Sequence, residues 1–539
     1  MRPCCRFTFT ILLFKLIFMK KLLVVSFFLC SLTGISQNTN YAEIVNKETL
    51  KKHLLIIAGE EMQGRETGTE GQRKAAAYIE QQFRSLGLTQ PPSLNGYQQE
   101  YPLFKDTLIN PKLEIDDAEA VIGQDYIVNI TANESVKIKS NSMVFAGYGI
   151  DDKEYSDYTN INVKGKIVVM FLGEPKKDGK YFLSGSEKSS KWTYPGIAEK
   201  LSTASAKGAV AVLFINPLQE KFSQKMKENA TRTNVYYPRE SEKNKVWHSI
   251  ISHPFATKIL GSAASQLISD AKNSSMLNAA TFEKKAKTKL KYTKQSIKVI
   301  ATNVIGVVEG SDKKDEYVFI TAHYDHLGVR DGKIYYGADD DGSGTVAVIN
   351  MAEAFAIAKA AGNGPRRSVV FMAVSGEEKG LWGSEYYSDN PVFPLEKTTV
   401  DLNIDMIGRI DTERRTADTM NYVYVVGHNK ISTELPVINE GVNNKYTGLT
   451  LDYKFDDPND KERIYFRSDH YNFARKGVPV LFFYDGMLQA DYHKPTDTVE
   501  KISWDLFEKR ARMIFHTAWE MANRNDMLIR DLPIPTDTR

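Results

Sequence analysis

The chain has 539 residues, of which 42% are hydrophobic and 25% charged, and its formal net charge is +3. This composition is typical of a globular protein and excludes a disordered one. The length is too great for one ordinary hydrophobic core, so we expect two domains. The small positive excess gives no reason to expect nucleic acid as a partner.

Residues 1–36 differ from the rest of the chain, with five basic residues and no acidic one. A basic pair after Met19, then the apolar run Leu22 to Leu32 and small residues up to Ser36, is typical of a signal peptide. We expect translation to start at Met19, with residues 1–18 a mis-annotated extension, and cleavage after Ser36. A retained membrane anchor is the alternative, but the apolar run is short for a spanning helix.

Cleavage after Ser36 leaves 65 basic and 67 acidic residues, a formal charge of −2. It also removes Cys4, Cys5 and Cys30, which are all the cysteines of the chain. We therefore expect an exported protein, periplasmic or extracellular, with no stable membrane anchor and no disulfide. Any metal site in it must be built from His, Asp and Glu.

Beyond residue 36 the sequence pattern changes twice. Residues 37–104 begin as helices, with one expected from Glu70 to Leu86, and residues 105–295 contain short β-rich runs between lysine-rich stretches. The basic run Lys284 to Lys294 is interpreted as a solvated strand at a domain edge. Residues 296–530 alternate between strands and helices, which predicts an α/β domain. The elements expected there are strands at 317–322, 368–374, 399–406, 422–426 and 478–484 and helices at 344–361 and 504–523.

The strand at 317–322 delivers His323 at its carboxyl end, where open α/β sheets place their functional sites. Asp325 follows two residues later. A histidine that binds metal needs its second ring nitrogen held, usually by a carboxylate, so Asp325 is a candidate partner of His323. His326 is expected to be a surface residue or a residue behind the ligands.

Acidic residues gather after the next two elements. Asp339, Asp340 and Asp341 lie in a glycine-rich turn that opens a helix, where an N-cap cluster is the plain alternative. Glu377 and Glu378 follow the strand at 368–374. Two adjacent acids there repel each other unless a cation is present. Metal binding by one and proton transfer by the other resolves that conflict, although a solvated loop pair remains the alternative.

Two further candidate ligands follow strands of the same sheet. Asp405 lies at the end of the strand at 399–406, where a buried carboxylate needs a metal or another partner; a strand-end cap is the alternative. His493 comes after the strand at 478–484. With His323, Asp340 and Glu378 these residues make five candidate ligands of nitrogen and oxygen type. Two imidazoles, three carboxylates and the spare glutamate Glu377 indicate two metal ions and an activated water.

The pattern resembles the co-catalytic zinc aminopeptidases, the bacterial leucyl aminopeptidase and glutamate carboxypeptidase relatives. The resemblance covers about residues 41–103 and 296–525 and rests on His323-x-Asp325, Asp339-Asp340 before Ser343-Gly344, Glu377-Glu378, Asn403-Ile404-Asp405-Met406, His493 and the loop Gln63 to Gly68. It implies a zinc-exopeptidase fold, a mixed central sheet flanked by helices, and two zinc ions per chain.

Carried over to this sequence, the resemblance implies roles for single residues. His323, Asp340, Glu378, Asp405 and His493 resemble the metal ligands, with Asp340 bridging the two ions. Glu377 resembles the general base, and Tyr492 a residue that contacts the scissile carbonyl in some relatives. A cis peptide bond between Asp340 and Asp341 is also implied.

The middle segment resembles an inserted, β-rich protease-associated domain. The similar stretches are Phe145 to Ile150, Val163 to Val168 and Lys207-Gly208-Ala209. Because the chain enters and leaves this segment beside the first strands of the α/β domain, we expect it to form a lid or side wall near the active-site cleft.

The sequence therefore predicts an exported, zinc-dependent metallo-exopeptidase acting on peptides, most simply an aminopeptidase. A carboxypeptidase or dipeptidase of the same family is an alternative, because the metal ligands do not determine which end of a peptide is held. A glutaminyl-peptide cyclase and a receptor-like binding protein without activity are the others. The full set of five ligands argues against the cyclase, and the presence of Glu377 argues against the receptor.

Overall fold

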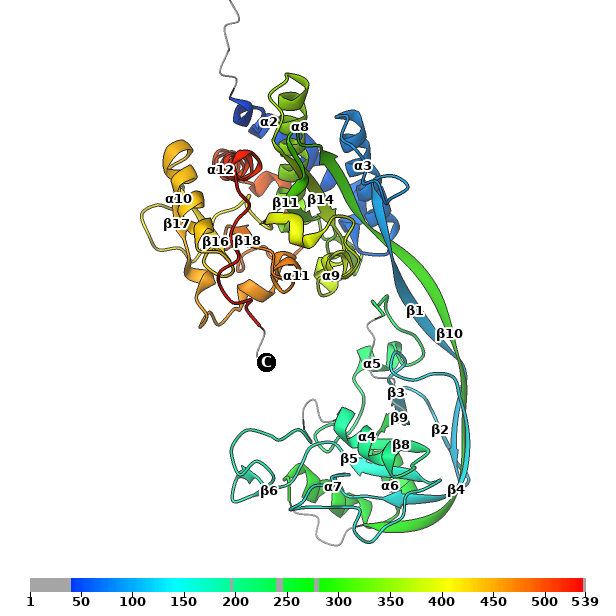
Figure 1. Cartoon of the computed structure of the whole chain (residues 1–539). Coiled ribbons are helices and arrows are strands. Elements are labelled where there is room, and N and C mark those ends of the chain that lie inside the picture. Colours follow the sequence, from blue (N-terminus) through cyan, green and yellow to red (C-terminus); the bar gives the residue numbers. More distant parts are fainter. Residues whose placement is uncertain (1–39, 194–196, 239–245, 276–280, 537–539) are drawn as a thin grey trace, which may run out of the picture.

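The computed structural model describes residues 40–193, 197–238, 246–275 and 281–536 (Figure 1). The predicted signal peptide, the start at Met19 and all three cysteines lie outside the described residues. Within the described ranges no helix is both long and apolar enough to cross a membrane.

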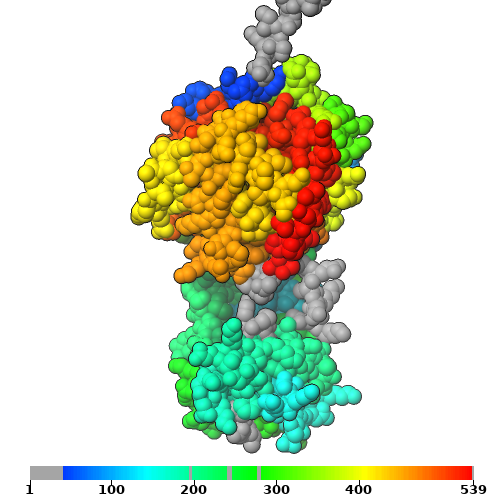
Figure 2. Space-filling view, turned by 60° about the vertical axis from the view of Figure 1, so that its left-hand side comes forward, coloured from blue at the N-terminus to red at the C-terminus, as the bar shows by residue number. Residues whose placement is uncertain are grey.

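The chain forms three parts: a main body, an arm and a lobe (Figures 1 and 2). The main body comprises residues 40–97 and 309–536. The arm consists of β1 (Gln98–Ile115) and β10 (Phe282–Val308), and the lobe comprises residues 116–281.

The strands of the main body form a mixed sheet in the order β17-β16-β18-β15-β11-β14-β10. Its four central strands run parallel, whereas β10 is antiparallel to β14 and β16 is antiparallel to β18. β17 is parallel to β16. Every residue of β14 is buried, as expected of a parallel strand covered on both faces. The bounds of these strands are β11 Lys313–His323, β14 Arg367–Val374, β15 Thr398–Ile404, β16 Tyr422–Val426, β17 Thr450–Asp452 and β18 Val480–Tyr484, with a separate hairpin of β12 Val329–Arg330 and β13 Lys333–Ile334.

Helices cover both faces of this sheet. α8 and α12 pack on one face, where Phe355 contacts both Phe371 of the sheet and Phe515. α9 and α11 pack on the other, where Phe319 lies against rings of both helices. The helices are α2 Lys47–Ile57, α3 Glu70–Ser85, α8 Gly344–Ala360, α9 Trp382–Asp389, α10 Glu434–Tyr446, α11 His470–Ala474 and α12 Trp504–Asn523. The strands and helices expected in residues 296–530 are all present, with small shifts of their ends.

Short helical turns connect the longer elements of the main body. They are η1 Tyr41–Ile44, η2 Glu60–Arg65, η3 Ala338–Ser343, η4 Glu377–Lys379, η5 Leu395–Lys397, η6 Lys454–Asp456, η7 Ile464–Phe466 and η8 Val499–Lys501. Two of them carry candidate site residues: η3, which follows the β12–β13 hairpin, and η4, which follows β14.

The arm is a long antiparallel ribbon that belongs to both sheets. β1 and β10 pair from Gln98↔Val304 to Ile115↔Thr288, and β10 continues into pairing with β14 at one end and with β4 at the other. The expected domain boundaries, 104/105 and 295/296, therefore fall inside continuous strands. The basic run Lys284 to Lys294 lies in β10 and alternates between exposed and buried positions; it is paired on both sides rather than at an edge.

The lobe has its own parallel sheet, in the order β4-β5-β8-β9, with β3 added antiparallel to β9. Helices pack around it, so the lobe is α/β and not only β-rich as expected. Its strands are β2 Ala118–Ala120, β3 Tyr126–Val128, β4 Val136–Phe145, β5 Ile167–Phe171, β6 Lys176–Lys177, β7 Lys180–Tyr181, β8 Ala211–Ile215 and β9 Trp247–Ile251, and its helices α4 Ile197–Ala206, α5 Gln224–Glu228, α6 His253–Leu260 and α7 Ala264–Lys272.

The direction of β10 sets which edge of the main body faces the lobe. β10 enters the main body from the lobe with increasing residue number, and Val304 pairs with Ala373 while Val308 pairs with Val369. Because β14 runs antiparallel to it, the carboxyl end of β14 points toward the lobe. β11 and β15 are parallel to β14, so the carboxyl edge that carries the candidate ligands faces the lobe (Figure 1).

Candidate metal centre

The carboxyl ends of three neighbouring strands deliver the candidate site residues. β11 ends at His323, β15 is followed directly by Asp405, and β14 is followed by the turn that carries Glu377 and Glu378. Parallel strands bring such residues to one edge of a sheet. His493 reaches the same edge from the loop after β18.

Three of the predicted ligands converge around one point. His323 Nε2 lies 3.3 Å from Asp340 Oδ1 and 3.5 Å from Asp405 Oδ1. His323 and Asp340 are almost fully buried. The pKa of His323 is raised well above its usual value, because the nearby carboxylates of Asp405 and Glu377 outweigh the opposing effect of burial.

The other oxygen of Asp340 belongs to a second group. Asp340 Oδ2 lies 3.2 Å from His493 Nε2, and His493 Nε2 lies 3.0 Å from Glu378 Oε2. Asp340 thus places one carboxylate oxygen in each group. All five predicted ligands are brought together in two sets that share a single residue.

These spacings fit zinc. Two atoms bound to one tetrahedral zinc at about 2.0–2.1 Å lie about 3.3 Å apart, close to the separations within both sets. Asp340 Oδ2 and Glu378 Oε1 are buried, and both lie close to imidazole nitrogens, at 3.2 Å from His493 Nε2 and 2.7 Å from His326 Nδ1. Buried carboxylates need a compensating partner, and a bound cation supplies one. The residues present therefore fit two zinc ions.

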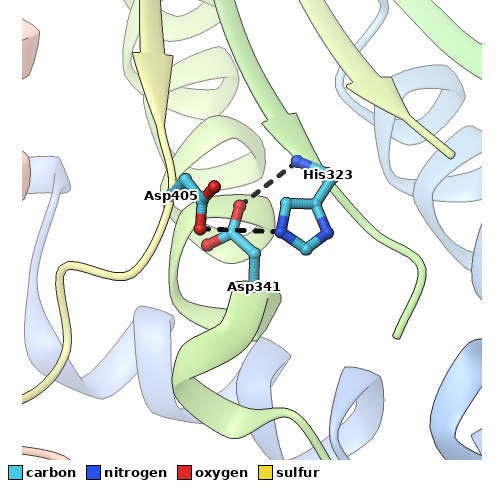
Figure 3. A group of neighbouring side chains, drawn as sticks. All are labelled: His323, Asp341 and Asp405. Atoms are coloured by element: carbon cyan, nitrogen blue, oxygen red, sulfur yellow. Dashed lines mark hydrogen bonds and ion pairs between the residues drawn. The ribbon is translucent and has the colours of Figure 1, made fainter. Parts of the chain in front are cut away.

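Asp341 also faces the first set (Figure 3) and forms, with His323 and Asp405, a group close enough to hold a metal. Its two oxygens, however, accept three backbone N–H groups, at 3.2 Å from His323, 2.8 Å from Gly344 and 3.1 Å from Met406. Those amides belong to, or adjoin, the segments that carry His323 and Asp405. Asp341 therefore holds the ligand-bearing backbone in place.

The turn that carries Asp340 is fixed from outside by Asp497. The Asp497 carboxylate accepts the backbone N–H groups of Asp339, at 3.0 Å, and Asp340, at 3.1 Å. The Asp339 carboxylate accepts the N–H of Gly408 at 2.8 Å, which ties the turn to the segment after β15. The peptide bond between Asp340 and Asp341 is cis, as the resemblance implied.

The neighbouring acids Glu377 and Glu378 differ in their surroundings. Burial raises the pKa of Glu378, but the imidazoles of His326 and His493 outweigh it and lower that pKa to about 2. Burial, together with Asp405 and Glu378, holds the pKa of Glu377 well above its usual value. Two carboxyl groups with pKa values driven apart are suited to different roles, one as an ionised ligand and one as a proton carrier.

Asp325 supports this site in a different way from the one expected. The Nδ1 of His323 lies 3.1 Å from the backbone carbonyl of Asp325 and 3.7 Å from its carboxylate. The carboxylate instead accepts a hydrogen bond from Thr67 Oγ1 at 2.5 Å and one from the backbone N–H of Glu377 at 3.2 Å. Asp325 thus orients the His323 ring through its main chain and the Glu377 backbone through its side chain.

His326 is fully buried, so the surface position considered for it is wrong. Its Nδ1 lies 2.7 Å from Glu378 Oε1 and 3.7 Å from Asp340 Oδ2, and these three residues form a second group close enough to hold a metal. His326 therefore lies beside Glu378, and its ring meets that of His493 edge-on with centroids 6.0 Å apart.

A small pocket of about 30 Å³ opens beside the two sets. Tyr492 lines it, stacks on His493 with ring centroids 3.8 Å apart and accepts a hydrogen bond from Arg467 at 3.2 Å. The other lining residues are Asp340, Glu377, Asp405, Met406, Ile464, Ser468, Phe482, Tyr484 and Leu488. All of them belong to the main body, and no described residue of the lobe lines this pocket.

Sequence reasoning missed the backbone anchors of the site. Arg65 is fully buried and donates to the carbonyls of Tyr324, Tyr336 and Gly337, which fixes both ends of the loop between His323 and Asp340. Asp497 follows His493 in a Pro-Thr-Asp-Thr run. For Arg65 the signal was a charged residue inside the loop Gln63 to Gly68 already noted, and for Asp497 it was an acid four residues after His493; neither indicated its partners.

Comparison of the sequence with known proteins gives matches to part of this chain. Residues 303–518 match the model of Peptidase family M28. Aminopeptidase YwaD of Bacillus subtilis (strain 168) is 26% identical over 255 residues, 46% of this chain and 50% of that protein. A probable leucine aminopeptidase of Arthroderma otae is 27% identical over 218 residues, 40% of this chain and 56% of that protein. The chain thus spans about half the length of these curated relatives.

Solved structures match over a longer part of the chain. The aminopeptidase from Aneurinibacillus sp. strain AM-1 aligns with 92% of this chain and 99% of its own, with a TM-score of 0.49 and 17% sequence identity.

Proposed function

We propose that this chain is a zinc-dependent aminopeptidase that hydrolyses N-terminal residues from peptides, since residues 303–518 match the model of Peptidase family M28. The observation that supports it most is the pair of ligand sets that share Asp340, with Glu377 beside them.

In this proposal the first zinc is held by His323, Asp340 and Asp405, and the second by Asp340, Glu378 and His493. Bound zinc lowers the pKa of a coordinated water to about 7 and polarises a carbonyl oxygen. The chain contributes ligands that are oriented in advance: Asp341 and Asp325 fix the backbone around His323.

Glu377 acts as the general base. It takes the proton of the attacking water and then passes it to the leaving amine, which is the exchange expected of a carboxyl group with a raised pKa. The Glu377 Oε2 lies 3.9 Å from His323 Nε2, so it adjoins the first ligand set. The hydrogen bond from its backbone N–H to Asp325 keeps it oriented.

The substrate is placed in the small pocket beside the ligands. Tyr492 lines this pocket, and its hydroxyl is proposed to contact the scissile carbonyl. The acidic edge suits the free ammonium group of a peptide, and the curated relatives above bear aminopeptidase names. These two points favour an aminopeptidase over a carboxypeptidase, a dipeptidase, a cyclase or a receptor.

Export to the periplasm or the outside, without a stable membrane anchor, is part of the proposal and rests on the signal-peptide pattern of residues 1–36. The lobe is proposed to be a protease-associated domain. It faces the carboxyl edge of the sheet from the far end of the arm, and its proposed role is to influence which substrates reach the site.

The direct test compares leucyl, alanyl and lysyl anilides with the same compounds acetylated on the amine, together with zinc analysis of the purified protein. We expect up to two zincs per chain, activity that a chelator removes, and hydrolysis only of the free amines. Equal rates on acetylated substrates, or activity that requires a free carboxylate, would exclude an aminopeptidase. Full activity without metal would exclude the metallopeptidase.

A further inference from the structure

A tyrosine of the arm is hydrogen-bonded to the loop that carries the proposed general base. Tyr101, in β1, is fully buried, and its hydroxyl lies 2.9 Å from the carbonyl oxygen of Ser375 and 2.8 Å from its Oγ. Ser375 Oγ donates its own proton to the carbonyl of Thr302 at 2.8 Å. The Tyr101 proton is therefore shared between the two oxygens of Ser375, two residues before Glu377.

The other strand of the arm holds the same serine. Asn303, in β10, accepts the backbone N–H of Ser375 at 3.3 Å and donates to Gln99 of β1 at 3.0 Å. Every polar group of Ser375 thus has a partner, and the arm supplies most of them. Only Gly376 separates Glu377 from this anchored serine.

Gly376 leaves little freedom between the anchor and the base. It has a positive φ of 80°, and a Cβ built on it would lie 2.8 Å from the Tyr101 hydroxyl and 2.9 Å from Trp382 Cβ. The Tyr101 hydroxyl therefore packs directly against the backbone that precedes Glu377. A one-ångström displacement of a reacting group can cost about 10²-fold in rate. A contact that holds the backbone before Glu377 therefore bears directly on the rate.

The chain of the lobe covers Tyr101 from outside. Residues 231–237 return from the lobe to the arm, where Tyr236 and Phe104 exchange both backbone hydrogen bonds at 2.9 Å. The next residue, Tyr237, meets the Tyr101 ring edge-on at 6.2 Å and stacks on Trp382 at 6.4 Å. The contact between arm and loop is therefore shielded from water by a segment outside the main body.

We propose that Tyr101 is a positioning residue for Glu377, acting through Ser375, and that residues 231–237 of the lobe seal this contact. The inference rests on the proposed function, because it requires Glu377 to be the base. It assigns the arm a part in the reaction: the ribbon that carries the lobe also fixes the carboxyl group that moves the proton.

The test is Tyr101→Phe, which keeps the ring and removes the hydroxyl. Tyr97→Phe is the matched control, because Tyr97 is also buried, also lies beside the first strand of the arm and also donates its hydroxyl to a backbone carbonyl, that of Leu88. For Tyr101→Phe we expect kcat on an aminoacyl anilide to fall about 10-fold, with KM and zinc content unchanged. Tyr97→Phe should leave all three unchanged.

A second measurement separates positioning of Glu377 from general loosening of the fold. In a Glu377→Gln background, Tyr101→Phe should cause no further loss of kcat, because the group it positions has already lost its function. Equal kcat for Tyr101→Phe and Tyr97→Phe, a loss that persists in that background, or loss of zinc would each overturn the inference.

The same variants distinguish failure of the inference from failure of the proposed function. A Glu377→Gln enzyme with wild-type activity removes the base assignment and the inference with it. A Glu377→Gln enzyme that is impaired as expected, beside a Tyr101→Phe enzyme with wild-type kcat, overturns only the role of Tyr101.

Discussion

The main body and the lobe both contain a parallel sheet with charged residues buried beside it. The two regions differ in how fully those charged groups are hydrogen-bonded by the protein. In the lobe, the Asp157 carboxylate accepts two backbone N–H groups and the Tyr155 hydroxyl, and Lys200 donates to the carbonyls of Phe171 and Gly173. No carboxylate oxygen of the described lobe residues is buried without a hydrogen bond.

At the carboxyl edge of the main body, the buried acids are left partly unpaired. Oxygens of Asp339, Asp340, Glu378 and Asp469 are buried without a hydrogen bond, although those of Asp340 and Glu378 lie near the imidazoles of His493 and His326. Burying so many acids together costs free energy unless cations, from the protein or bound to it, compensate them. Since both sheets are parallel, what sets this edge apart is the group of buried acids that it collects.

The largest expected effect comes from the shared ligand. Asp340→Asn should lower zinc to less than one per chain and reduce activity at least about 10³-fold, because a catalytic metal contributes several kcal/mol. Asp157→Asn is the counterpart in the lobe, where the carboxylate is satisfied by the protein itself. It should lower Tm and leave zinc content and kcat unchanged. If the Asp340→Asn variant still bound two zincs, Asp340 would be no more important for metal binding than Asp157 of the lobe, and the contrast between the two regions would be wrong.

The next largest effects should distinguish the two adjacent glutamates, one by a loss of kcat and the other by a loss of zinc binding. Glu377→Gln is expected to keep its zinc and fold and to lose about 10²-fold or more in kcat, the scale of general base catalysis. Glu378→Gln should instead bind zinc more weakly, since its carboxylate lies 3.0 Å from His493. Metal analysis and steady-state kinetics on both variants check this. The opposite pattern would mean that ligand and base are exchanged.

Tyr492→Phe should have a smaller effect. If its hydroxyl contacts the carbonyl in the transition state, kcat falls roughly 10-fold to 10²-fold with little change in KM, toward the low end for loss of one hydrogen-bond donor. The ring remains stacked on His493, so zinc content should stay the same. A variant that loses zinc but keeps kcat per metal would assign Tyr492 a packing role.

The smallest effect on activity is expected in the lobe. Burial lowers the pKa of Lys200 to about 7, against the opposing effects of Asp157 and Glu174. Between pH 7 and the ordinary lysine value the unfolded chain binds the proton and the folded chain does not, so stability should rise with pH across that range. Lys200→Met should flatten this dependence of Tm on pH and leave kcat unchanged. A steeper rise in the variant would contradict the assignment.

The sequence predicted the residues at strand ends well, because those positions depend on local patterns. The apolar run before His323 and the one before Glu377 each specify a buried strand, and parallel strands bring their carboxyl ends together. The five proposed ligands were chosen from local motifs, and the structure brings their side chains together. Hydrophobic periodicity likewise placed helix α3, and the apolar run that begins at Gly344 placed α8.

What the sequence did not reveal depends on contacts between distant segments. The carboxylate of Asp325 accepts a hydrogen bond from the backbone N–H of Glu377, 52 positions away. Its backbone carbonyl, and not its carboxylate, contacts His323, the partner that was expected. His326 proved buried because the turn with Asp340 closes over it. Residues 231–237 gave no sign that they return to the arm, since their pairing with β1 spans more than a hundred residues.

The arm also has a consequence for how the chain folds. It is a β-hairpin in which the turn is an entire folded lobe, between Ile115 and Thr288. Closing a flexible loop on the order of 170 residues costs about 4–5 kcal/mol of entropy. A lobe that folds first brings those two residues together, and β1 and β10 can then pair progressively toward the main body. β10, the strand that pairs with β14, is therefore brought into position by the lobe. The lobe itself lies outside the main body, whose sheet β10 completes.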